Sequence, residues 1–127
     1  MSRILIIEDD PFYLEFLETI LVGEGYDVLL ARNGREGLRL LRTQSVDLVV
    51  TDIIMPEMDG LETILEMAAT SRPTPIIAIS GGGPRMPAHL NMQMAEKLGA
   101  VTTLKKPIIK EDLLNAVQKF LPGSAPS

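Results

Sequence analysis

The sequence predicts an α/β fold in which five parallel strands form one doubly wound sheet covered by five helices. Two patterns carry this prediction: short apolar runs recur five times, and in most of the segments between them apolar residues recur at spacings of three and four. Strands that alternate with helices pair in parallel and are covered by helices on both faces. The chain has 127 residues, of which 46% are hydrophobic. This length and composition are enough for one domain with its own hydrophobic core.

The strand candidates are short and apolar, and several are rich in Val and Ile, which favour strands. In chain order they are residues 4–7 (ILII), 26–31 (YDVLLA), 47–51 (DLVVT), 75–80 (PIIAIS) and 100–104 (AVTTL).

The helix candidates are amphipathic, with apolar residues on one predicted face. The apolar positions are Phe12, Phe16, Leu17, Ile20 and Leu21 in the first, Leu61, Ile64, Leu65 and Ala68 in the third, and Leu113, Leu114, Val117 and Leu121 in the last. Asp10 before Pro11 is typical of a helix N-cap, and Asn33 or Gly34 is expected to start the second helix. Gly23, Gly25 and Gly99 are expected near helix ends.

Composition excludes several classes of function. The net charge of −5 disfavours binding to nucleic acid phosphates or to an anionic membrane, so neither is expected as a partner. The absence of cysteine excludes disulfides and thiolate-bound metals. No stretch approaches the roughly 20 apolar residues that span a bilayer, and the first residues do not form a signal peptide. We therefore expect a cytoplasmic protein.

Acidic residues follow two of the predicted strands. Glu8 and Asp9 come directly after the first strand, and Asp52 comes at the end of the third, before a loop with Pro56. In a doubly wound sheet, ligands bind beyond the carboxyl ends of the strands, where the winding direction reverses. Carboxylates gathered there would repel one another unless a cation lay between them. A hard divalent ion such as Mg²⁺ fits oxygen ligands of this kind.

The last two strands end in groups that bind anions. Ser80 ends the fourth strand, and Lys105 and Lys106 follow the fifth, just before Pro107. A hydroxyl and an ammonium are suited to the oxygens of an anion. Together with the acids, they indicate a site for a phosphoryl group on a carboxylate.

In this order, the motifs resemble those of the receiver domain of bacterial two-component response regulators, over residues 3–121. The resemblance implies the (βα)5 flavodoxin-like architecture of that family. It implies that Asp52 accepts a phosphoryl group from a phosphohistidine, that Ser80 binds a phosphoryl oxygen and that Lys106 pairs with the phosphate. It also implies that Mg²⁺, or Mn²⁺ in its place, is held by Glu8, Asp9, Asp52 and the main-chain carbonyl of Ile54.

Asp10 and Lys105, each adjacent in the sequence to a predicted site residue, are assigned to roles outside the site. The metal ligands of the family are the first two acids after the strand, which leaves Asp10 to cap the first helix. The lysine of the family directly precedes the proline, which selects Lys106 and leaves Lys105 facing solvent.

The sequence departs from the family pattern in two places. The family's switch pairs the hydroxyl residue, here Ser80, with an aromatic residue three positions before the lysine, and Thr103 stands there. The stretch between Ser80 and Lys106 is also longer than usual. A receiver fold that signals without phosphorylation therefore stays open as an alternative.

The expected organisation is a receiver domain over residues 1–121 and a disordered tail over 122–127. With no effector domain in the 127 residues, a stand-alone receiver is expected, a monomer or weak dimer. The resemblance implies a histidine kinase or histidine phosphotransfer protein as donor and a downstream protein as target. It implies a phosphoacceptor with Mg-dependent self-phosphorylation and autodephosphorylation rather than an enzyme.

Two other classes fit less well. A flavodoxin-like electron carrier needs a phosphate-binding loop after the first strand, where this chain has acids, and the chain has no Trp. A haloacid-dehalogenase-type phosphatase needs a second Asp two positions after its nucleophile. Ile54 stands there after Asp52.

Overall fold

Ten elements alternate strictly between strand and helix in the computed structural model, which describes residues 2–53, 60–69, 74–81 and 88–121. In chain order they are β1 (Arg3–Ile7), α1 (Pro11–Gly23), β2 (Asp27–Ala31), α2 (Gly34–Thr43), β3 (Leu48–Asp52), α3 (Gly60–Ala68), β4 (Ile76–Ser80), α4 (Ala88–Leu98), β5 (Thr102–Lys105) and α5 (Lys110–Phe120). The predicted tail, residues 122–127, lies outside the described residues.

The five strands form one parallel sheet in the order β2-β1-β3-β4-β5. The chain runs outward from β1 to β2 and then crosses to β3 on the other side of β1, so the winding direction reverses between β1 and β3. This is the place in a doubly wound sheet where ligands bind, at the carboxyl ends of the strands.

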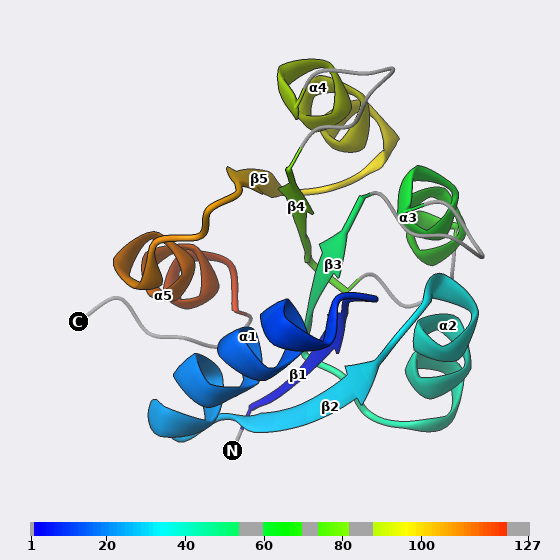
Figure 1. Ribbon diagram of the computed structural model, residues 1–127. Helices are drawn as coiled ribbons and strands as arrows, with labels where there is room; N and C mark the ends of the chain where they lie inside the picture. The colour runs from blue at the N-terminus through cyan, green and yellow to red at the C-terminus, as the bar shows by residue number, and fades with distance from the viewer. Residues whose placement is uncertain (1, 54–59, 70–73, 82–87, 122–127) are drawn as a thin grey trace.

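Helices cover both faces of the sheet (Figure 1). Because successive strand side chains point to opposite faces, Ile4 and Ile6 of β1 pack with α1 and α5, while Leu5 and Ile7 pack in a second cluster with α2, α3 and α4. Side chains of β3 and β4 are buried throughout, as expected for inner parallel strands. The predicted doubly wound α/β fold is confirmed.

The predicted helix caps are confirmed. The Asp10 carboxylate accepts a hydrogen bond of 2.9 Å from the backbone N–H of Phe12, and Pro11 is the first residue of α1. Asn33 caps α2 by accepting a 2.8 Å bond from the Glu36 N–H. Gly25 and Gly99 follow α1 and α4 with φ of 91° and 133°, a region that favours glycine. No helix in the described ranges is long and apolar enough to cross a membrane.

The predicted apolar face of the first helix was partly wrong. Phe12 and Phe16 are 85% and 42% exposed, and the buried residues of α1 are Leu14, Leu17, Ile20 and Leu21. At about 100° per residue, the two phenylalanines share a stripe of their own, displaced from the stripe that faces the sheet. They line a surface groove of about 280 Å³ with Tyr13, Pro107 and Ile108. Leu65 of α3 is likewise exposed, while Ile64 is buried.

Candidate functional site

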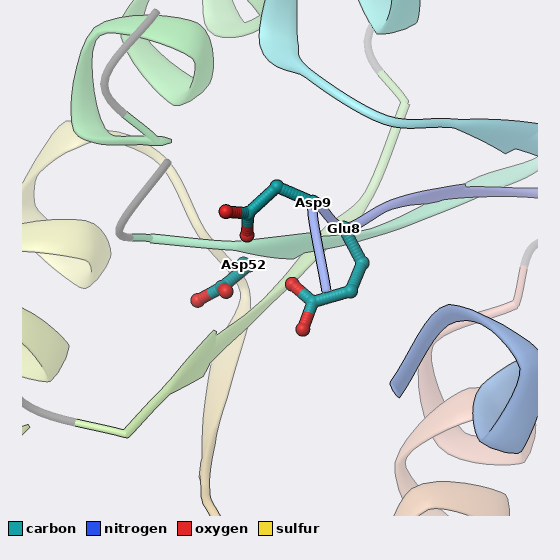
Figure 2. A group of neighbouring side chains, drawn as sticks. All are labelled: Glu8, Asp9 and Asp52. Carbon is teal, nitrogen blue, oxygen red and sulfur yellow. The ribbon is translucent and has the colours of Figure 1, made fainter. Parts of the chain in front are cut away.

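Three carboxylates converge at the carboxyl ends of β1 and β3. Glu8 and Asp9 directly follow β1, and Asp52 is the last residue of β3. Because β1 and β3 are paired neighbours, their ends bring these side chains to one place, and Figure 2 shows the three carboxylates close together. One oxygen of each lies within 4.8 Å of one oxygen of each of the others. The predicted acidic cluster therefore forms.

The three acids differ in exposure. Glu8 is 1% exposed and Asp52 5% exposed, whereas Asp9 faces solvent. The cluster thus has a buried floor and an open side. Buried carboxylates are costly unless they are paired or bind a cation.

Lys106 supplies the positive charge in this cluster. Its Nζ lies 2.8 Å from Glu8 Oε1 and 3.2 Å from Asp52 Oδ2, and its side chain is 20% exposed. The residue directly follows β5, and its backbone N–H donates to the Ser80 carbonyl oxygen at 2.8 Å. The predicted choice of Lys106 over Lys105 agrees with this geometry, because Lys105 is exposed.

The surroundings shift the proton affinities of both partners. Burial, followed by the neighbouring Asp52 carboxyl group, raises the pKa of Glu8 to about 8, and the hydrogen bond from Lys106 opposes that shift. Burial lowers the pKa of Lys106, but its hydrogen bond with Glu8 and the charge of Asp52 outweigh burial, so the pKa lies above its ordinary value. Lys106 is therefore charged at neutral pH, while the two buried acids crowd together.

The donor set fits a divalent cation. Glu8 Oε2 is buried and has no hydrogen-bond partner among the described residues. An oxygen of this kind costs free energy unless something occupies its lone pairs. Three carboxylates with one open side match the needs of Mg²⁺, which takes a few protein oxygens and usually keeps several waters.

The remaining predicted site residues are placed as follows. Ser80 is buried at the carboxyl end of β4, next to β3, and pairs in register with Lys105. Thr103 lies half-buried within β5, opposite Ala78. Ile54 and the stretch before α4, residues 82–87, lie outside the described residues.

One neighbour of the site was not predicted. The Lys106 Nζ lies 4.3 Å from the centroid of the Tyr13 ring, a cation–π contact. Tyr13 belongs to α1, far from Lys106 in the chain. No local pattern in the sequence signals this contact.

Comparison with known families decides the classification. The family model described as response regulator receiver domain matches residues 4–118, nearly the whole chain. The chain is a response regulator receiver domain. This confirms the family resemblance drawn from the strand-end motifs, and members of the family are phosphoacceptor signalling domains rather than classical enzymes.

Individual relatives agree with this classification. The receiver is 36% identical to the transcriptional regulatory protein GlrR of Escherichia coli over 99% of its own length, but spans only 28% of GlrR. Among solved structures it resembles a CheY-like receiver from Methanospirillum hungatei, with a TM-score of 0.85, 28% identity and coverage of 94% and 92%. It also resembles TrrA of Thermotoga maritima, a complex with Mg²⁺-BeF, with a TM-score of 0.84, 30% identity and coverage of 95% and 100%.

Proposed function

We propose that this receiver domain accepts a phosphoryl group on Asp52, with Mg²⁺ held by Glu8, Asp9, Asp52 and the main-chain carbonyl of Ile54. The convergence of the three acids around Lys106 is the observation that carries this proposal. The structure of the similar TrrA contains Mg²⁺-BeF, which supports a related site here. Mn²⁺ would fit the same oxygen ligands.

The chain's own residues perform the transfer. An Asp52 carboxylate oxygen forms the new P–O bond while the P–N bond of a donor phosphohistidine breaks, and the departing imidazole takes up a proton. The Lys106 ammonium, which lies 3.2 Å from Asp52, would pair with the phosphoryl oxygens, and the Ser80 hydroxyl would bind one of them. A cation held by Glu8, Asp9 and Asp52 would offset negative charge on the phosphoryl oxygens. Hydrolysis of the same P–O bond returns Asp52 to its carboxylate.

The phosphoryl group acts as a switch in this proposal. It adds charge and acceptor oxygens beside Ser80 and Lys106, which lie at the ends of neighbouring strands β4 and β5. Phosphorylation would bias these segments between two arrangements and change the surface offered to a partner. Thr103 lies within β5 opposite Ala78 and has no aromatic ring.

The proposed partners follow from the chemistry. A histidine kinase or a histidine phosphotransfer protein supplies the phosphoryl group, and a downstream protein reads the surface. Direct contact with nucleic acid or membrane is not proposed, because the net charge is −5. The receiver unit is assigned to residues 1–121, acting in the cytoplasm as a monomer or weak dimer. Signalling without phosphorylation has no observation in its favour, since the acids and Lys106 do come together.

Intact-protein mass spectrometry tests the proposal. The protein is incubated with Mg²⁺ and acetyl phosphate, and we expect one added phosphoryl group that depends on Mg²⁺. Asp52→Asn should abolish the adduct, because the amide is a poor nucleophile. An adduct on Asp52→Asn, or none on the folded wild type under trapping conditions, would overturn the assignment.

Asp10→Asn is the matched control for this experiment. It changes an acid in the same sequence cluster, and asparagine caps helices as well as aspartate does. We expect it to take up the phosphoryl group as the wild type does.

A further inference from the structure

Among the described residues, two carboxylates and one aromatic ring lie against the Lys106 ammonium. Glu8 Oε1 and Asp52 Oδ2 lie 2.8 and 3.2 Å away, and the face of the Tyr13 ring lies 4.3 Å away, measured to its centroid. The ring is held in turn by Phe16, edge to face, with centroids 5.8 Å apart and planes at 84°. The lysine therefore contacts the face of an α1 ring that itself packs against a second aromatic ring.

The carbon stem of Lys106 is also constrained. A Cβ added at Gly81 would lie 3.2 Å from Lys106 Cδ and 3.6 Å from its Cβ, so the Gly81 backbone lies close against the stem. With the backbone N–H bonded to Ser80, the side chain is supported from its base to its charged end.

We propose that Tyr13 is a positioning residue that holds the Lys106 ammonium at Asp52. This inference rests on the proposed function of Asp52. Lysine has a flexible stem with several rotatable bonds, and holding it in one arrangement costs conformational entropy. A ring face attracts the ammonium through its quadrupole and carries no net charge. Tyr13 therefore holds the lysine without adding a negative charge that would repel an incoming phosphoryl group.

The first test measures the order of the Lys106 side chain by NMR relaxation at its Cε in the wild type, Tyr13→Phe and Tyr13→Leu. We expect the lysine to be ordered in the wild type and in Tyr13→Phe, which keeps the ring, and more mobile in Tyr13→Leu. Equal order in all three proteins would overturn the proposal, whether or not the site binds a phosphoryl mimic.

The second test measures beryllofluoride affinity in the presence of Mg²⁺ by calorimetry. We expect Tyr13→Leu to bind about fivefold more weakly and Tyr13→Phe to bind as the wild type does. In a Lys106→Met background, Tyr13→Leu should have no further effect, because the ring acts only through the lysine. The same loss with and without Lys106 would indicate a general structural role and overturn the proposal.

A control variant and a replacement variant keep the possible outcomes of these tests distinguishable. Phe12→Leu removes an exposed aromatic next to Tyr13 in the chain and should bind as the wild type does. If Tyr13→Leu does not unfold cooperatively, Tyr13→Met replaces it, because methionine fills similar space without a ring. A wild type with an ordered lysine that binds no beryllofluoride would overturn the proposed function of Asp52 and leave the lysine contact standing.

Discussion

Glu8 is almost completely buried, yet its Oε2 has no hydrogen-bond partner among the described residues. Its other oxygen accepts from Lys106 at 2.8 Å. Burial is the largest cause of the raised pKa of Glu8, which is about 8. A carboxyl group so poorly compensated is destabilising unless a cation occupies the open coordination, which ties the energetics of this residue to metal binding.

We expect Mg²⁺ affinity to fall as the pH is lowered through the Glu8 pKa of about 8. Below that pH an increasing share of the metal-free protein carries a proton on Glu8. Because the cation binds the carboxylate, it must displace that proton, so acid weakens binding and alkali strengthens it. Calorimetric titrations at about pH 6.5 and about pH 8.5 check this, with buffers of different ionisation enthalpy to count the released protons. Equal affinities and no proton release would contradict it.

At the scale of the element, α2 lies close against β1 through Gly37. A Cβ built on Gly37 would overlap Cδ1 of Ile7 and lie 2.7 Å from its Cγ1. Ile7 is fully buried in β1, directly before Glu8, so it has little room to move. The absence of a side chain at Gly37 thus allows α2 to approach the strand that carries the site.

Gly37→Ala is expected to lower the free energy of unfolding by about 1–3 kcal/mol, although alanine gains about 1 kcal/mol in helix propensity. The overlap with Ile7 must be relieved by moving the helix or the strand. Gly23→Ala is the matched control at the end of α1, where an added Cβ meets nothing within 4 Å. It should be neutral or stabilising by up to about 1 kcal/mol. Urea unfolding of both variants measures these changes. A Gly37→Ala variant as stable as the wild type would contradict the prediction.

At the scale of the whole molecule, the reversal of winding between β1 and β3 creates the site. The side chains of β1 after Arg3 and all those of β3 are buried, so packing on both faces of the sheet holds the carboxyl ends of these strands in place. The fold of the sheet therefore brings the three acids to one edge. Crowding them there is a cost to the folded state that a cation would relieve.

Mg²⁺ is accordingly expected to stabilise the folded protein. At a free concentration one hundred times its dissociation constant, the ion adds about 2.7 kcal/mol to the free energy of unfolding. Thermal unfolding with Mg²⁺ and with EDTA measures the shift. Asp9→Asn, which removes one exposed ligand, should show a smaller shift at the same Mg²⁺ concentration. An identical shift in both proteins would exclude Asp9 from the metal site.

Local patterns in the sequence determined the elements and most of the site. Alternation of strand-length runs with helical spacing identifies the α/β class, because these periodicities depend only on nearby residues. The helix caps Asp10 and Asn33 could also be predicted, because capping involves residues that are close in the sequence. Glu8, Asp9 and Asp52 could be placed together because the carboxyl ends of parallel strands share one edge of a sheet.

Tertiary structure alone decided the contacts between distant segments. The sequence pattern does not specify which side of α1 meets the sheet, so Phe12 and Phe16 were wrongly assigned to the buried face. Nor does it specify that Lys106 reaches both Glu8 and Asp52 or lies over the Tyr13 ring. Such contacts arise from the packing of α1 and the end of β5 around the same edge. Their geometry depends on the whole sheet rather than on any neighbouring residues.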